Sequence, residues 1–600
     1  MDTIKCNELK NIIFSHLNFN FDGKINFTKK DGVYAKYGEN EAVIGFEDKI
    51  TLCRALFVFA KEYSKGERNF EIFQKKHFKD CGVMVDCSRN AVLTVDGAKS
   101  YIRNMAALGL NFLMLYTEDT YEIKEYPYFG YLRGRYTKDE IKEITDYAEK
   151  FGIEVIPCIQ TLAHLSKFLK WKQPFVLRDT EDILLVDGEE TYKFIECTVK
   201  SVSEMFKSKR IHIGMDEAHN VGLGKFLDKF GFQNRFEIIT RHLNKVVEIC
   251  KKYGLEPMMW SDMFFRLASS SNDYYDEENT SPEETINSIP DVGMVYWDYY
   301  TKNEEMYLKQ IKKHRQLKRP VIFAGGISVW YGHLPEFDQT LETSFAALKA
   351  CAKEKIDTVF ATLWGDDGNE CCAQFSSSLL PFYSEFFYLG ENCTEDDVKS
   401  ASEFLTDQTF DLTKIIGSFD YRKDKTFVRG KVLLYSDILY GSGINGEIVS
   451  SLTARYESFL PEIKKAMDKK DANFKKYEFA YVLYEICKTK AELDLNLQKK
   501  YLENDISYLR NVSENVLPNL KHLYAKFKTL HKNMWYEIYK PFGFEVLSIR
   551  YGGVVSRIDD AIDAINAYLN KNEKICELCE KRLESNTVVY KDTTPTSFMW

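Results

Sequence analysis

The feature that most constrains the fold is a repeated alternation of apolar strands and amphipathic helices between residues 80 and 364. Runs typical of buried strands recur eight times, and most are separated by stretches with helical periodicity. The expected strands are 82–86, 111–116, 153–159, 210–216, 257–262, 294–299, 320–325 and 358–364. The expected helices are 98–108, 138–151, 235–253, 304–317 and 341–355, with Asp96, Thr137 and Asp338 as cap residues near helix starts.

This alternation predicts an α/β fold, a (β/α)8 TIM barrel, over residues 76–395. The alternative is a doubly wound open sheet, but no Gly-x-Gly-x-x-Gly follows the first strand, so the barrel is favoured. Residues 1–75 predict a small α/β domain with strands at 25–28, 33–37 and 42–46 and a helix over 51–63. Residues 396–600 predict a C-terminal helical domain with helices at 396–405, 446–467, 474–502 and 555–583. Phe479, Leu483 and Ile486 recur there at helical spacing and are expected to pack helices together.

Composition describes an ordinary globular protein, with 44% hydrophobic and 28% charged residues in 600. A net charge of −9 argues against a nucleic-acid or anionic-membrane surface, and no apolar run is long enough to span a membrane. The N-terminus lacks the basic start and apolar core of a signal peptide, so we expect a cytoplasmic protein with reduced cysteines. The Cys576-x-x-Cys579 pair lies in a helical pattern without a second ligand pair, so no metal and no cofactor are expected.

Polar and aromatic residues gather where the predicted strands end. Active sites of such barrels lie at the carboxyl-terminal ends of the strands, so these residues should face one cavity. Four of the seven tryptophans stand there, namely Trp260, Trp297, Trp330 and Trp364. Tryptophan rings beside charged groups suit a neutral sugar, because the rings cover its apolar faces while the charged groups bind its hydroxyls.

The fourth strand ends in the adjacent carboxylates Asp216 and Glu217. On a regular strand these two would point to opposite faces, so both can reach one cavity only where the strand turns into a loop. Gly214, two residues before Asp216, is expected to leave room for a ligand. Two carboxylates placed in this way suit acid/base chemistry.

The stretch His212-Ile213-Gly214-Met215-Asp216-Glu217 resembles the His-x-Gly-x-Asp-Glu pattern of the family 20 glycoside hydrolases, or β-N-acetylhexosaminidases. The run from Tyr126-Pro127 to Val155-Ile156-Pro157 also follows the family between strands 2 and 3, and the likeness covers residues 80–390. Leu162-Ala163 replaces Pro-Gly before His164, and Glu118-Asp119-Thr120 replaces Asp-Asp-Gln. The family's Tyr-x-Asp after strand 7 is missing, which leaves the acetamide-binding tyrosine open between Tyr299 and Tyr331.

The resemblance implies removal of terminal β-linked GlcNAc or GalNAc from small glycans by a retaining, substrate-assisted mechanism. In it, the substrate's acetamide oxygen attacks the anomeric carbon and forms an oxazolinium intermediate. Glu217 would be the acid/base, its protonated form favoured by a nearby ionised Asp216, and Asp216 would hold the acetamide N–H. The implied substrate-binding residues are Arg89, His164, Trp260, Trp297, Tyr299, Trp330, Tyr331, Trp364, Asp366 and Glu370.

Two other functions fit parts of this pattern. One is a metal-dependent barrel hydrolase that would use His164, His212, Asp216 and His219. Against it, His212 is expected to point into the packed barrel and His219 lies on the following loop. The other is a non-catalytic sugar-binding protein, and retention of the whole Asp216-Glu217 pair argues against it.

Overall fold

The computed structural model describes the whole chain except residues 1–2, 277–280, 424–425 and 589–600. It divides into two compact units, which are described separately. The first comprises residues 1–327, 339–364 and 377–406, and the second comprises residues 328–338, 365–376 and 407–600. In the described residues, no helix is both long and apolar enough to cross a membrane.

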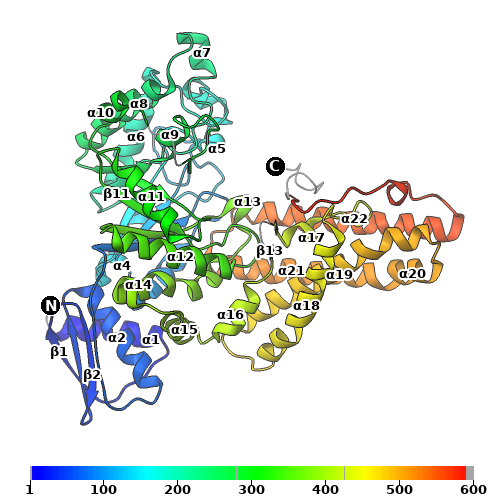
Figure 1. Cartoon of the computed structure of the whole chain (residues 1–600), viewed down its shortest axis with the longest axis horizontal. Helices are drawn as coiled ribbons and strands as arrows, with labels where there is room; N and C mark the ends of the chain where they lie inside the picture. Colours follow the sequence, from blue (N-terminus) through cyan, green and yellow to red (C-terminus); the bar gives the residue numbers. More distant parts are fainter. Residues whose placement is uncertain (1–2, 277–280, 424–425, 589–600) are drawn as a thin grey trace. The chain divides into compact units, whose positions relative to one another are not determined.

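The first unit contains a closed barrel of eight parallel strands, which confirms the predicted fold (Figure 1). The strands follow one another around the barrel in sequence order, and β12 closes it by pairing with β5. They are β5 (Asp80–Asp86), β6 (Phe112–Tyr116), β7 (Glu154–Cys158), β8 (Arg210–His212), β9 (Glu256–Trp260), β10 (Gly293–Trp297), β11 (Val321–Gly326) and β12 (Thr358–Leu363). Because both faces of each strand are covered, the strands read as continuous apolar runs.

Helices follow most of the strands and surround the barrel. The longer ones are α3 (Val95–Leu108), α4 (Lys138–Phe151), α6 (Glu189–Met205), α8 (Arg235–Lys252), α11 (Glu304–Arg315) and α12 (Phe337–Lys353). Thr137 caps α4 in a capping box with Glu140, as predicted. The cap of α3 is Thr94 rather than Asp96, because the Thr94 hydroxyl accepts the N–H of Gly97 and Asp96 lies inside the first turn. Asp338 likewise lies inside the first turn of α12.

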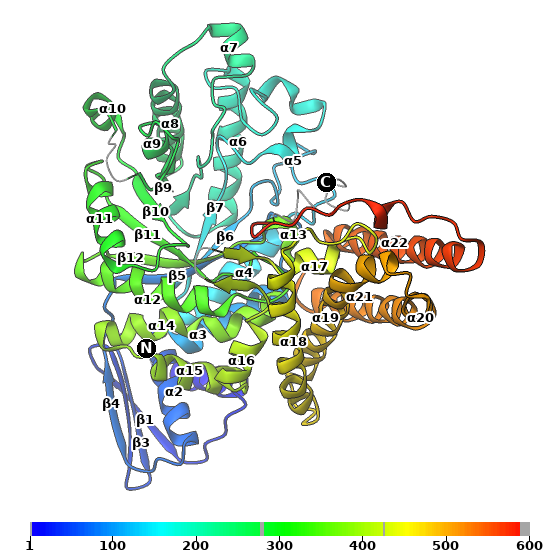
Figure 2. The same cartoon turned by 45° about the vertical axis from the view of Figure 1, so that its right-hand side comes forward.

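A small domain precedes the barrel in the first unit (Figure 2). Its sheet has the order β1-β3-β2-β4 and is accompanied by two helices. The elements are α1 (Thr3–His16), β1 (Lys24–Lys29), β2 (Val33–Gly38), β3 (Glu41–Phe46), α2 (Lys49–Ser64) and β4 (Phe70–Gln74). Arg54 of α2 is fully buried and makes a bidentate ion pair of 2.6 and 2.7 Å with Glu385 of α14 (Pro381–Leu389), which anchors the small domain to the rest of the unit.

The second unit is mainly helical, as predicted for the C-terminal region. Its long helices are α18 (Gly446–Met467), α19 (Phe474–Leu502), α21 (Leu517–Ile538) and α22 (Phe544–Lys571), beside a two-stranded ribbon of β13 (Tyr421–Lys423) and β14 (Thr426–Val428). Phe479, Leu483 and Ile486 are fully buried along α19, which confirms their packing role. The helix α22 ends at Lys571, so Cys576 and Cys579 lie at a short 3-10 turn instead of in an α-helix.

Candidate active site

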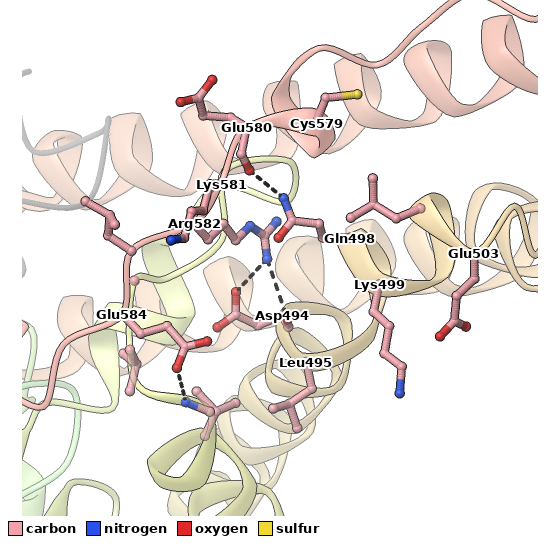
Figure 3. Close-up of a pocket in the computed structure, with 16 residues that line it drawn as sticks. Asp494, Leu495, Gln498, Lys499, Glu503, Cys579, Glu580, Lys581, Arg582 and Glu584 are labelled. Carbon is pink, nitrogen blue, oxygen red and sulfur yellow. Dashed lines mark hydrogen bonds and ion pairs between the residues drawn. The ribbon is translucent and has the colours of Figure 1, made fainter.

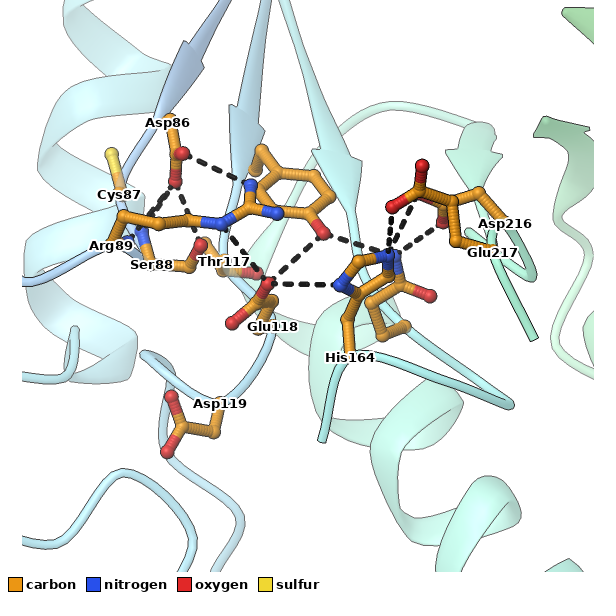
Figure 4. Close-up of polar contacts among 12 residues, drawn as sticks. Asp86, Cys87, Ser88, Arg89, Thr117, Glu118, Asp119, His164, Asp216 and Glu217 are labelled. Carbon is orange, nitrogen blue, oxygen red and sulfur yellow. Dashed lines mark hydrogen bonds and ion pairs between the residues drawn. The ribbon is translucent and has the colours of Figure 1, made fainter. Parts of the chain in front are cut away.

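The site begins at the end of β5, where Asp86 fixes the position of Arg89. Asp86 Oδ1 accepts the N–H and hydroxyl of Ser88, and Oδ2 accepts Nη1 of Arg89 at 3.0 Å. The Arg89 guanidinium lies 4.9 Å from the ring centres of both Tyr116 and Trp364. Its Nε is 3.5 Å from Oε1 of Glu118 (Figure 4). Arg89 is therefore held by carboxylates and aromatic rings and still keeps 22% of its side chain exposed, so it can bind sugar hydroxyls.

Glu118 and His164 continue the chain of contacts toward the carboxylate pair. Nδ1 of His164 is 4.0 Å from Oε1 of Glu118, and Nε2 is 3.2 Å from Oδ2 of Asp216 and 3.6 Å from Oε2 of Glu217. Figure 4 shows His164 directed at both members of the pair. Burial alone would lower the pKa of His164, but Asp216 and Glu118 outweigh it and raise the pKa to about 9. The ring is therefore a cation at neutral pH.

Asp216 is buried and strongly stabilised as an anion. Burial would raise its pKa, but His164 and the amide of Gln160 hold it well below its usual range. Nε2 of Gln160 donates to Oδ1 of Asp216 at 2.7 Å, and Oε1 of Gln160 accepts the N–H of Met215. The space beside Gly214 belongs to the same glutamine, because a Cβ built on Gly214 would lie 2.1 Å from Gln160 Oε1. The expectation that Gly214 makes room for a ligand was therefore wrong.

Glu217 differs from Asp216 in exposure and backbone conformation. Its side chain is 41% exposed, and its φ of +49° is in the left-handed region. Glu118, His164 and Met215 also have positive φ values, of 36°, 57° and 73°. Such strain in non-glycine residues collects at functional sites. The turn carries the two neighbouring carboxylates out of strand geometry, so that His164 contacts both.

Aromatic residues at or just beyond the ends of β9, β10 and β12 lie near this group in the first unit. Trp364 packs edge-on against Tyr116 at 4.8 Å and lies 5.9 Å from Trp260, whereas Trp297 stacks on Tyr299 at 5.3 Å. Burial raises the pKa of Tyr299, and hydrogen bonds with Trp364 and Thr362 oppose this shift. Trp260 is 1% exposed and packs against His212, so it supports the site from the barrel interior.

The remaining predicted binding residues belong to the second unit. Trp330 and Tyr331 are 4% and 6% exposed, and Asp366 is exposed at the start of α13 (Asp366–Asn369). Their contacts with a sugar stay predictions. Glu370 differs from its expected role because it is 2% exposed and both carboxylate oxygens are engaged, Oε2 by Lys431 at 3.0 Å and Oε1 by Arg550. A carboxylate used in this way stabilises the unit's core and is not available to sugar hydroxyls.

The metal-dependent alternative would use His212 and His219 as ligands besides His164 and Asp216. His212 is fully buried against Trp260, and its Nδ1 accepts the N–H of Gly214 at 3.1 Å. Burial lowers the pKa of His212 to about 3. His219 lies on the loop after Glu217, where Asn272 approaches it at 3.5 Å. Among the described residues, no group of three or more His, Cys, Asp and Glu side chains is arranged to hold a metal ion.

A cavity of about 670 Å³ lies elsewhere, between α18, α19 and the chain after residue 578 in the second unit (Figure 3). Arg582 approaches Asp494 at 3.5 Å there, and Gln498 donates to the carbonyl of Glu580 at 2.8 Å. None of the residues predicted for catalysis or sugar binding lines it. The candidate active site is thus the polar cluster of the barrel.

A parallel barrel with two neighbouring carboxylates beyond its strand ends has the groups that glycosidases use. Comparison with known families gives the same class. Residues 78–286 match the catalytic domain of glycosyl hydrolase family 20, and residues 404–597 match the glycoside hydrolase 20C C-terminal domain. The chain belongs to glycoside hydrolase family 20.

Curated relatives are similar over part of their length. The chain is 25% identical to beta-hexosaminidase A of Caenorhabditis briggsae over 314 residues. This match covers 47% of this chain and 52% of that protein. It is 27% identical over 237 residues to human hexosaminidase D, which covers 36% and 45%. The chain thus spans about half the length of the curated relatives it matches.

Two solved structures share the fold. The GH20 exo β-N-acetylglucosaminidase of Vibrio harveyi, solved with N-acetylglucosamine, superposes with a TM-score of 0.51 at 16% identity, covering 68% of this chain and 73% of that one. The GH20 β-N-acetylhexosaminidase of Streptomyces coelicolor A3(2) has the same TM-score and identity, covering 68% and 91%. At this identity the likeness extends to the fold alone.

Proposed function

We propose that the protein is an exo-acting β-N-acetylhexosaminidase that removes terminal β-linked GlcNAc or GalNAc from small glycans. The observation that carries the proposal is the position of His164, which lies 3.2 Å from a buried Asp216 and 3.6 Å from a partly exposed Glu217. Asp216 is thereby kept ionised and enclosed, whereas Glu217 is left accessible to a substrate. Family membership and the hexosaminidase names of the relatives support the same activity.

The proposed mechanism is retaining and substrate-assisted, which is the scheme associated with this family. The acetamide oxygen of the substrate attacks the anomeric carbon, and Glu217 donates a proton to the leaving oxygen. Asp216 accepts the acetamide N–H and offsets the positive charge that develops on the ring; its low pKa keeps it ionised throughout. Glu217 then takes a proton from the water that opens the oxazolinium ring.

Binding of the terminal sugar is assigned to side chains around this pair. Arg89 would bind the 3- and 4-hydroxyls, and Trp364 would cover the apolar face of the ring. Tyr299 is our choice for the acetamide carbonyl, because it stacks on Trp297 and its hydroxyl bonds with Trp364 in the unit that holds Asp216. Asp366, Trp330 and Tyr331 are further sugar-binding residues that the family resemblance implies, whereas both carboxylate oxygens of Glu370 are already engaged.

The activity is tested with aryl β-N-acetylglucosaminides and N-acetylgalactosaminides. The wild-type protein should turn over at least one series, and Glu217→Gln should abolish cleavage of natural disaccharides while sparing substrates with very acidic leaving groups. Binding of GlcNAc without turnover would favour the non-catalytic sugar-binding protein. Loss of turnover on chelation would favour the metal-dependent hydrolase.

We also propose that the protein works in a reducing cytoplasm. Eleven of the 14 cysteines are buried, which suits thiols that stay reduced and supports this compartment. Intact-mass measurement of the native protein after thiol alkylation should find every cysteine modified once the chain is unfolded. Disulfides in that sample would contradict the proposal.

A further inference from the structure

Asp262 is a fully buried carboxylate that contacts the acid/base residue through the backbone. It begins α9 (Asp262–Arg266), and only Ser261 separates it from the end of β9. Its Oδ2 accepts the N–H of Glu217 at 3.0 Å and Nε of Arg266 at 3.2 Å. Its Oδ1 is buried and has no hydrogen-bond partner among the described residues. A buried carboxylate with only one oxygen hydrogen-bonded lowers the stability of the fold. Its place beside Glu217 is therefore not explained by stability.

The bond from Glu217 to Asp262 fixes an unfavourable backbone turn. Glu217 has a φ of +49°, and Met215 two residues earlier has a φ of +73°. Left-handed conformations cost a non-glycine residue about 1–2 kcal/mol, so they persist only where the surroundings hold them. The N–H of Met215 is held by Gln160 at 3.1 Å, and that of Glu217 is held by Asp262. The direction in which the Glu217 side chain leaves the backbone therefore depends on Asp262.

Arg266 connects the two carboxyl groups from one helical turn further on. While its Nε binds Asp262, its Nη2 lies 3.7 Å from Oε1 of Glu217. His164 lies 3.6 Å from the other oxygen, Oε2. Each oxygen of the Glu217 carboxyl thus faces one basic side chain, which sets the orientation of the group. The Arg266 guanidinium is itself confined, at 5.8 Å from the ring centres of both Tyr274 and Trp297.

We propose that Asp262 is a positioning residue for Glu217, with Arg266 as the brace that couples their carboxyl groups. This inference rests on the proposed function. Asp262 affects proton transfer because it positions Glu217, and it does not bind the sugar itself. The charged groups that face it are Asp216, Glu217 and Arg266. Burial and Asp216 raise the pKa of Asp262, whereas the Glu217 N–H and Arg266 oppose this shift, so the two bonds favour the ionised form that holds the turn.

The experiment compares substrates that differ in their need for acid catalysis. In Asp262→Ala, kcat/KM for a disaccharide should fall ~10-fold to 100-fold more than for a dinitrophenyl glycoside, because only the poor leaving group needs a well-placed proton donor. Asp262→Asn keeps an oxygen that can accept the Glu217 N–H, so it should recover most of the activity on the disaccharide. Binding of a thiazoline inhibitor should change little in both variants, because Asp216 and Gln160 remain in place.

Asp298 provides the matched control. It is a buried carboxylate after the next strand, β10, and it accepts the backbone N–H groups of Tyr300 and Thr301 at 3.0 Å each. Asp298→Ala removes the same kind of bond without a contact to Glu217. It should therefore lower kcat/KM for the two substrates by the same factor.

If Asp262→Ala fails to fold, Arg266→Gln tests the proposal instead. The Arg266 side chain is 15% exposed, so its replacement disturbs the core less than replacement of the fully buried Asp262. Arg266→Gln should also lower activity selectively on the disaccharide. Equal losses on both substrates in the Asp262 and Arg266 variants, as in the Asp298 control, would overturn the positioning role alone. A wild-type protein that turns over neither substrate would overturn the proposed function and this inference together.

Discussion

Gln160 occupies the space that any side chain at position 214 would require. A Cβ on Gly214 would lie 2.1 Å from Gln160 Oε1 and 2.8 Å from the carbonyl oxygen of Ile159. The glycine thus allows Gln160 to reach Asp216 with its amide and Met215 with its oxygen. The Gln160 bond thereby adds to the His164 contact that keeps Asp216 ionised in the proposed mechanism.

Gly214→Ala should therefore displace Gln160 and strongly reduce turnover. Gly254→Ala is the matched control, because Gly254 has a similar φ, +69° against +72°, but no neighbour within 4 Å of an added Cβ. Both variants carry the cost of a left-handed alanine, about 1 kcal/mol. Kinetics with an aryl glycoside should show a loss in Gly214→Ala alone. Similar activity in the two variants would refute the role given to Gln160.

His164 should make stability depend on pH in a defined direction. Its pKa is about 9 in the folded protein and 6.5 ordinarily, so its stabilisation is complete below about pH 6.5 and is lost as pH rises through 9. His164→Gln should lower the free energy of unfolding by about 2 kcal/mol at pH 6 and by much less at pH 9.5. Chemical denaturation at both pH values measures this. A deficit that grows with pH would contradict the ion pair with Asp216.

Glu370 should be a stability residue of the second unit. Its ion pairs with Lys431 and Arg550 are buried, with all three side chains at most 2% exposed. Arg550→Met should destabilise that unit by about 3–5 kcal/mol, because it leaves a buried carboxylate without one partner. Lys475→Met, at the exposed Lys475–Glu537 pair, is the control and should leave the melting temperature nearly unchanged. A normal melting temperature for Arg550→Met would return Glu370 to the sugar-binding candidates.

The fold was predictable because each strand and each helix of a closed parallel barrel has its own local sequence pattern. Each buried strand is a continuous apolar run, and each covering helix shows its own period. The bounds of α18 and α19 were predicted to the residue. β8 was predicted to extend to 216 but ends at His212, because Gly214 and Met215 adopt positive φ. The helix α6 was not predicted at all.

The carboxylate pair and its histidine were predictable from position, because strand ends of a barrel converge. The residues that bind this pair could not be predicted from the sequence. Gln160 is 56 residues from Asp216, and Asp262 is 45 residues from Glu217. Arg550 is 180 residues from Glu370, so the pairing that removed Glu370 from the candidates has no local pattern. The one available signal for Asp262 was its place as the last residue of the predicted fifth strand, among the same strand ends.

The choice between the two tyrosines can be measured by inhibitor binding. Tyr299→Phe should weaken binding of a thiazoline analogue of the cyclised intermediate, because it removes the hydroxyl assigned to the acetamide carbonyl. The expected loss is about 10-fold, the value of one hydrogen bond to a polar ligand group. Tyr331→Phe should bind normally, since Tyr331 packs against Phe427 and Arg429 in the second unit. The reverse result would assign the carbonyl to Tyr331.

The central claim is that the substrate's own acetamide is the nucleophile, and it is tested most directly by looking for a covalent sugar. The wild-type protein is incubated with a 2-fluoro glycoside, its intact mass is recorded, and thiazoline inhibition is measured in parallel. We predict no adduct, and thiazoline inhibition far tighter than inhibition by GlcNAc, because the thiazoline resembles the intermediate that Asp216 stabilises. A sugar attached to Asp216, together with weak thiazoline inhibition, would contradict the mechanism and indicate double displacement through a glycosyl-enzyme.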